Sequence, residues 1–95
     1  MNVENKINIK KEWFDNIRRK IKNPLINGND QKWIDLADKT LDELENGSIK
    51  FENLVSYVQE NEWSLVNFFS LKFSVYEFIV REIILTNFAE KVKEN

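Results

Sequence analysis

DQKWIDLADKTLDELENG, residues 30–47, is the stretch that decides the fold class. Its inward-facing residues recur every three or four positions, as on one face of an α-helix: Trp33, Leu36, Ala37, Thr40, Leu41 and Leu44. Asp30 can accept hydrogen bonds from the first backbone amides, and Gly47 stands where a helix commonly ends in a left-handed residue. The stretch is therefore predicted to form an amphipathic helix that is capped at both ends.

The segments on either side of this helix follow the same periodicity. Apolar residues at four-residue spacing predict a first helix over residues 9–23. Pro24 ends it, because the residue before a proline disfavours the α conformation. Residues 23–29 are then predicted to form a loop. A short third helix is predicted over residues 51–60.

The C-terminal third is the most apolar part of the chain and predicts a helix from about residue 64 to about residue 92. Its polar residues form one narrow stripe with spacings of three and four residues: Asn67, Ser70, Ser74, Glu77 and Arg81. A helix that is apolar over most of its circumference is buried on most sides. Residues 70–76 also alternate between apolar and polar, so helix, bend and strand all remain open there.

These elements predict an all-α fold, a compact bundle of about four helices with a long, mostly buried C-terminal helix. Residues 1–95 are expected to form a single helical domain, in which residues 1–8 are a flexible N-terminal tail. We expect no signal peptide, no membrane span and a cytoplasmic location, because the N-terminus has no apolar run and charges interrupt residues 63–85. The apolar circumference of the last helix exceeds what three short helices can cover, which makes a homodimer an alternative to a monomer.

The residue types that carry most catalytic chemistry are missing from this sequence. It has no His and no Cys, which excludes Ser-His-Asp and Cys-His catalysis within the chain, disulfides and Cys/His zinc sites. Two Gly cannot build a glycine-rich phosphate loop. Carboxylates are plentiful, but no motif places two of them in a defined catalytic or metal-binding relation. We therefore expect no enzyme activity, no cofactor and no metal site.

Charge is segregated along the chain, although the net charge is only -2. Residues 1–24 carry seven Lys or Arg against three acids, residues 25–62 carry three Lys against nine acids, and residues 63–95 carry four of each. Four acids with spacings of three and four residues form an acidic ridge on the predicted helix at residues 30–46: Asp35, Asp38, Asp42 and Glu45. Like charges at this spacing destabilise a helix by about 0.2–0.5 kcal/mol per pair. The ridge is interpreted either as a surface that binds a basic partner or as a solvated face that keeps the chain soluble.

The predicted first helix is basic on one side. Lys11, Arg18 and Lys22 share that side and Arg19 is adjacent, a set able to contact the phosphates of nucleic acid. The alternative is that Trp13 belongs to the core and these bases neutralise the acidic helix predicted at residues 30–46. The acidic isoelectric point of about 5.2 favours the alternative, because nucleic-acid-binding domains are usually basic as a whole.

The turn Asn46-Gly47-Ser48-Ile49 between two predicted helices resembles the layout of small immunity proteins of the colicin D kind. The resemblance is confined to this helix-turn-helix pattern and implies no functional residue.

These features favour a non-enzymatic protein that inhibits or neutralises a partner protein, as immunity proteins, antitoxins and phage anti-defence proteins do. The acidic ridge, helped by Glu52, would occlude a basic surface of the partner, and Tyr57 or Trp63 would supply an aromatic anchor. Two alternatives remain. One is a small nucleic-acid-binding regulator that uses the basic N-terminal helix, and the other is an assembly subunit that docks through its apolar C-terminal helix.

Overall fold

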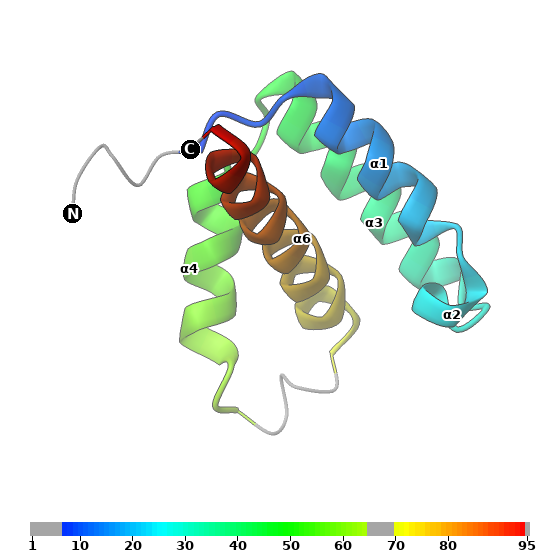
Figure 1. The fold of residues 1–95 in the computed structure, drawn as a ribbon. Helices are drawn as coiled ribbons and strands as arrows, with labels where there is room; N and C mark the ends of the chain where they lie inside the picture. The colour runs from blue at the N-terminus through cyan, green and yellow to red at the C-terminus, as the bar shows by residue number, and fades with distance from the viewer. Residues whose placement is uncertain (1–6, 65–69, 95) are drawn as a thin grey trace.

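The computed structural model describes residues 7–64 and 70–94, and these residues contain five helices and no strand. The helices are α1 Lys11–Ile21, α2 Pro24–Asn27, α3 Gln31–Asn46, α4 Phe51–Asn61 and α6 Leu71–Glu94. The long C-terminal helix α6 lies between α4 on one side and the antiparallel pair of α1 and α3 on the other (Figure 1). The predicted all-α class is confirmed.

Helix α3 has the caps that the sequence predicts. One carboxylate oxygen of Asp30 accepts hydrogen bonds from the backbone amides of Lys32, at 3.0 Å, and Trp33, at 3.4 Å. At the other end Gly47 has a φ of +85°, a left-handed conformation that is strained for residues with a side chain. These caps fix the length of the helix that carries the acidic ridge.

The connection between α1 and α3 is more ordered than the predicted loop, and that prediction was wrong. It contains the one-turn helix α2, whose first backbone N–H group, that of Leu25, donates to the side chain of Asn23 at 2.9 Å, because Pro24 has no N–H. Asn27 is buried, and its amide group donates to the carbonyl oxygen of Ile21 at 2.8 Å and accepts from the backbone amide of Asn29 at 2.7 Å. Polar side chains rather than apolar periodicity shape this turn, so the periodicity did not reveal it.

Residues 71–76 are helical, which resolves the ambiguity between helix, bend and strand. Ser70 precedes the helix, and its hydroxyl accepts a hydrogen bond from the backbone amide of Phe73 at 2.9 Å. Helix α6 begins at Leu71, later than the predicted start near residue 64. Neither Ser64 nor Ser70 belongs to a helix. Asn67 of the predicted polar stripe lies outside the described residues.

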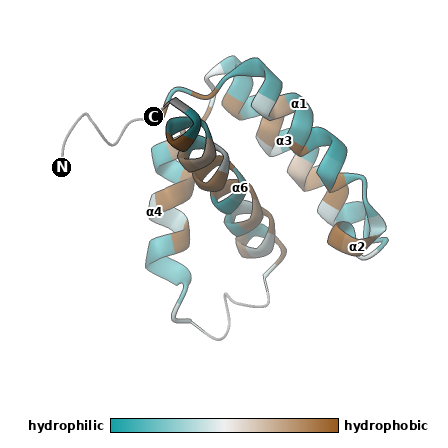
Figure 2. Ribbon diagram, viewed as in Figure 1, coloured by the Kyte–Doolittle hydropathy of each residue, from teal (hydrophilic) through white to brown (hydrophobic). Residues whose placement is uncertain are grey.

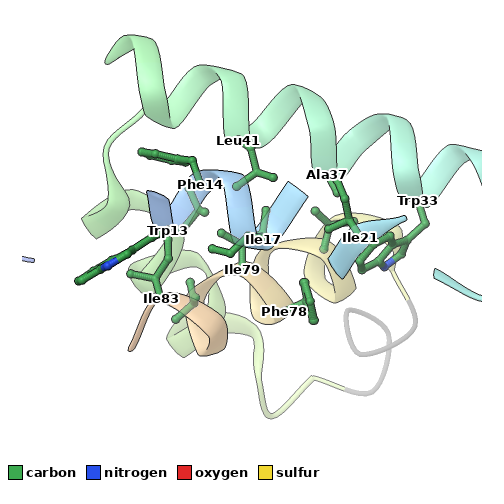
Figure 3. Close-up of a cluster of buried hydrophobic side chains, with 13 residues drawn as sticks. Trp13, Phe14, Ile17, Ile21, Trp33, Ala37, Leu41, Phe78, Ile79 and Ile83 are labelled. Carbon is green, nitrogen blue, oxygen red and sulfur yellow. The ribbon is translucent and has the colours of Figure 1, made fainter. Parts of the chain in front are cut away.

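The core forms where α1, α3, α4 and α6 meet. Side chains from α1, α3 and α6 converge in it (Figure 3), and hydrophobic residues, brown in Figure 2, recur along α6. Its members are Trp13, Phe14, Ile17, Ile21, Trp33, Ala37, Leu41, Leu54, Val75, Phe78, Ile79, Val80 and Ile83. Trp33 also ties α3 to α6, because its indole nitrogen donates to the hydroxyl of Ser74 at 3.0 Å and its ring meets Phe78 edge-on at 5.6 Å.

Of the expected flexible tail at residues 1–8, only residues 7 and 8 are described, and Ile7 packs partly buried against the core. In the described ranges 7–64 and 70–94, no helix is both long enough and apolar enough to cross a membrane.

Candidate protein-binding surface

The acidic ridge lies on the outer side of α3, because its spacing places it opposite the buried residues Trp33 and Ala37. Three of its members are exposed and one, Asp38, is partly buried. The ridge therefore presents carboxylates along the helix at a rise of about 1.5 Å per residue.

Arg18 of α1 binds the C-terminal half of the ridge. Its guanidinium donates to Asp42 at 2.9 Å and lies 2.8 Å from a carboxylate oxygen of Glu45. Lys11 lies 4.0 Å from Glu45 and 3.4 Å from Asp15. Burial lowers the pKa of Arg18, but the hydrogen bonds and charges of the two ridge carboxylates outweigh it, so the pKa of Arg18 is raised. Helix α1 thus neutralises this half of the ridge.

The N-terminal half of the ridge keeps its negative charge. Within the described part of the chain, neither Asp35 nor Asp38 takes part in an ion pair, and Asp35 accepts a hydrogen bond from the side-chain amide of Gln31 at 2.8 Å. A neutral donor leaves the charge of the carboxylate in place. The two ends of the ridge therefore differ: one half is an ion-pair cluster with α1, and the other is available to an outside cation.

An apolar hollow of about 320 Å³ opens at the C-terminal end of the ridge. Glu45 of the ridge and Glu52 of α4 stand at this hollow, so the turn between α3 and α4 brings Glu52 to the ridge. Its apolar lining comes from the N-terminal segment, α1, α3 and the start of α4: Ile7, Ile9, Phe14, Leu44, Ile49 and Phe51. Lys50 lines the hollow as well, and Glu45 is already paired with Arg18. A hollow of this composition suits an apolar side chain.

The two predicted aromatic anchors differ in exposure, and neither lies on the ridge. Trp63 is 90% exposed beyond the end of α4, so the length of this helix separates it from Glu52. Tyr57 packs edge-on against Tyr76 at 5.2 Å, and the Lys72 ammonium lies 4.8 Å from the centre of the Tyr57 ring. Burial, together with the nearby negative charge of Glu43, raises the pKa of Tyr76. Tyr57 is thus part of an internal aromatic cluster.

The predicted basic face does not stay together as one surface. Lys11 and Arg18 turn toward α3, while Arg19 donates to the side chain of Asn16 on its own helix and Lys22 is exposed. Lys20, which the sequence did not single out, lies 2.6 Å from Glu82 of α6. The contacts of Lys11 and Arg18 agree with the alternative in which the bases of the first helix neutralise the acidic helix α3, whereas that of Lys20 leads to α6.

Comparison with known proteins gives no relative: the chain matches no protein-family model, no curated protein and no solved structure. Across residues 7–64 and 70–94, no group of three or more Asp or Glu side chains is arranged to hold a metal ion. The surface of α3 and its hollow therefore have to be interpreted from their own chemistry.

Proposed function

We propose that this chain is a non-enzymatic inhibitor that binds a partner protein and occludes a basic surface on it, as immunity proteins, antitoxins and phage anti-defence proteins do. The supporting observation is the divided ridge on α3. Arg18 forms ion pairs with Asp42 and Glu45. Asp35 is exposed and Asp38 is partly buried, and neither forms an ion pair with another described residue. A basic partner would supply the missing cations.

The ion-pair cluster and the hollow would give this contact its shape. Because Arg18 holds the carboxylates of Asp42 and Glu45, they lose little conformational freedom when a partner binds. The apolar hollow beside Glu45 and Glu52 would receive an apolar side chain of the partner. The field of the ridge would speed encounter with a basic surface and select against acidic ones.

Reversing charge on the open half of the ridge is expected to weaken partner binding. Asp35→Lys with Asp38→Lys should raise the dissociation constant at low salt by about tenfold or more, since both substitutions place like charges against a basic surface. The partner would be captured with the wild-type chain from cells that contain it, and calorimetric titrations would be run at two salt concentrations.

A matched control carries the same change in net charge at another place. Glu60→Lys with Glu62→Lys alters exposed positions at the end of α4 and should leave the affinity within about twofold at the higher, near-physiological salt concentration, because exposed charges beyond a Debye length are then screened. Equal loss in both double variants would show that only net charge matters, and unchanged affinity in the α3 variant would refute the ridge as the binding surface.

Arg18→Gln separates the proposed function from nucleic-acid binding. Removing this cation exposes the charge of Asp42 and Glu45, so association with a basic partner should accelerate by about twofold to fivefold at low salt. A nucleic-acid-binding regulator would instead lose affinity for phosphates. Stopped-flow experiments would measure the rate of association with the partner, and fluorescence anisotropy would measure the affinity for generic DNA and RNA. Slower partner association together with weaker nucleic-acid binding would favour the regulator.

A further inference from the structure

The second half of α6 carries a row of exposed apolar side chains on the side away from the core. Ile84, Leu85, Phe88 and Val92 are 45%, 57%, 66% and 55% exposed. Residues with this spacing line up along one side of a helix. Ile83 is fully buried on the opposite side, so this half of α6 has two apolar sides and the described helices cover one of them. We call the four exposed residues the apolar row.

The same side of α6 is polar in its first half. Ser74, Glu77 and Arg81 precede the apolar row with the same spacing, and Arg81 donates to Glu77 at 2.8 Å. The polar stripe predicted from the sequence therefore ends at Arg81, and apolar residues replace it. Since a helix side that faces water is normally polar throughout, this change indicates that another surface covers the second half.

The apolar row is large enough to act as an interface. Its four side chains expose on the order of 400 Å² of apolar surface, within the range where the largest patch of a monomer is often functional. A standard interface buries about 800 Å² on each partner. The row would supply about half of that area and the polar residues beside it the remainder, which corresponds to a weak, reversible complex.

We propose that the apolar row binds the apolar row of a second copy of this chain in an antiparallel, two-fold symmetric dimer. In such a dimer each surface meets itself, so a surface of one charge repels its copy. Residues 1–24 are net positive and residues 25–62 are net negative, whereas residues 63–95 carry four acids and four bases. Of the three segments, the one that forms α6 is the one without net charge, so contact between two copies of this helix is not opposed by net repulsion.

The antiparallel direction follows from the charges beside the apolar row. In a parallel pair Glu77, Arg81 and Lys91 would each lie next to the same residue of the second copy, and like charges at that distance repel. In an antiparallel pair with Phe88 beside the two-fold axis, Glu77 lies 11 positions from the axis, or about 16 Å at the rise of a helix. Arg81 lies seven positions from the axis, so the two copies of Glu77 are about 33 Å apart along the helix, those of Arg81 are about 21 Å apart, and Ile84 meets Val92. Lys91 lies three positions from the axis, beside Leu85 of the second copy, where its aliphatic stem can cover apolar surface while the ammonium reaches water.

The first test is the oligomeric state of the full chain. Sedimentation equilibrium from about 5 to about 500 µM should show a monomer–dimer equilibrium with a dissociation constant on the order of tens of micromolar. Phe88→Glu should shift this constant at least about thirtyfold toward monomer, whereas Gln59→Glu, which adds the same charge on exposed α4, should not. A wild-type chain that stays monomeric at the highest concentration would overturn the proposal, and so would a dimer that Phe88→Glu leaves unchanged.

Single cysteines test the geometry separately, because the chain has none of its own. Phe88→Cys should form a disulfide-linked dimer under mild oxidation, and Glu77→Cys on the same side of α6 should not, because its two copies lie about 33 Å apart. Linkage at both positions would indicate a parallel dimer, and linkage at neither would place the contact elsewhere. Both results contradict the proposed arrangement, and both are readable even if Phe88→Glu alters folding.

Discussion

Ile79→Ala is expected to lower the free energy of unfolding by about 3 kcal/mol, a large part of the stability of a domain of this size. Ile79 is fully buried in α6, where it meets the side chains that α1 and α3 turn inward (Figure 3). Shortening it removes three carbon atoms from the centre of the core and leaves a cavity that the neighbouring helices can fill only in part. Urea denaturation followed by circular dichroism would measure the loss.

Ile84→Ala is the matched control, because it makes the same chemical change on the same helix. Ile84 is 45% exposed and belongs to the apolar row, so its loss should cost less than about 1 kcal/mol in the monomer. Both variants should be measured at a few micromolar, below the concentration at which the proposed dimer forms. Equal losses at the two positions would mean that α6 does not separate a core side from an exposed side as the structure indicates.

The sequence predicts these helices well where local chemistry and periodicity agree. In α3 the apolar spacing, the Asp30 cap and the Gly47 end all point to one helix, and each has its counterpart in the structure. In α6 the alternating residues 70–76 left helix, bend and strand open, but the polar stripe that alternation does not explain continues on the helix through Ser74, Glu77 and Arg81. Both cases rest on interactions between residues that are close in sequence.

The candidate surface was harder to predict, because it depends on contacts between distant segments. The acidic ridge could be listed from spacing alone, but its division into two halves requires Arg18 to lie across from Asp42, 24 residues away. The hollow beside Glu52 combines the N-terminal segment, α1, α3 and α4, and no single segment carries a signal for it. The exposure of Phe88 likewise depends on which side of α6 the other helices cover.

The polar turn joins α1, which carries Arg18, to α3, which carries the acidic ridge, so a substitution in the turn tests both the fold and the surface. Asn27→Ala is expected to lower the free energy of unfolding by about 2 kcal/mol. It removes two hydrogen bonds of a buried side chain and leaves the carbonyl oxygen of Ile21 without the donor it has at 2.8 Å. Urea denaturation would again give the value.

Asn23→Ala is the control for this substitution, since it deletes an asparagine from the same turn. Asn23 is exposed and its side chain accepts one hydrogen bond at the start of α2, so its loss should cost about 1 kcal/mol or less. If Asn27→Ala lowers the free energy of unfolding by no more than Asn23→Ala does, the buried amide of Asn27 does not fix the turn. If it does fix the turn, the same variant should also loosen α1 against α3, and Arg18→Gln should then cost less stability in the Asn27→Ala background than in the wild-type chain. Such coupling would tie the acidic surface to a polar turn between the two helices that form it.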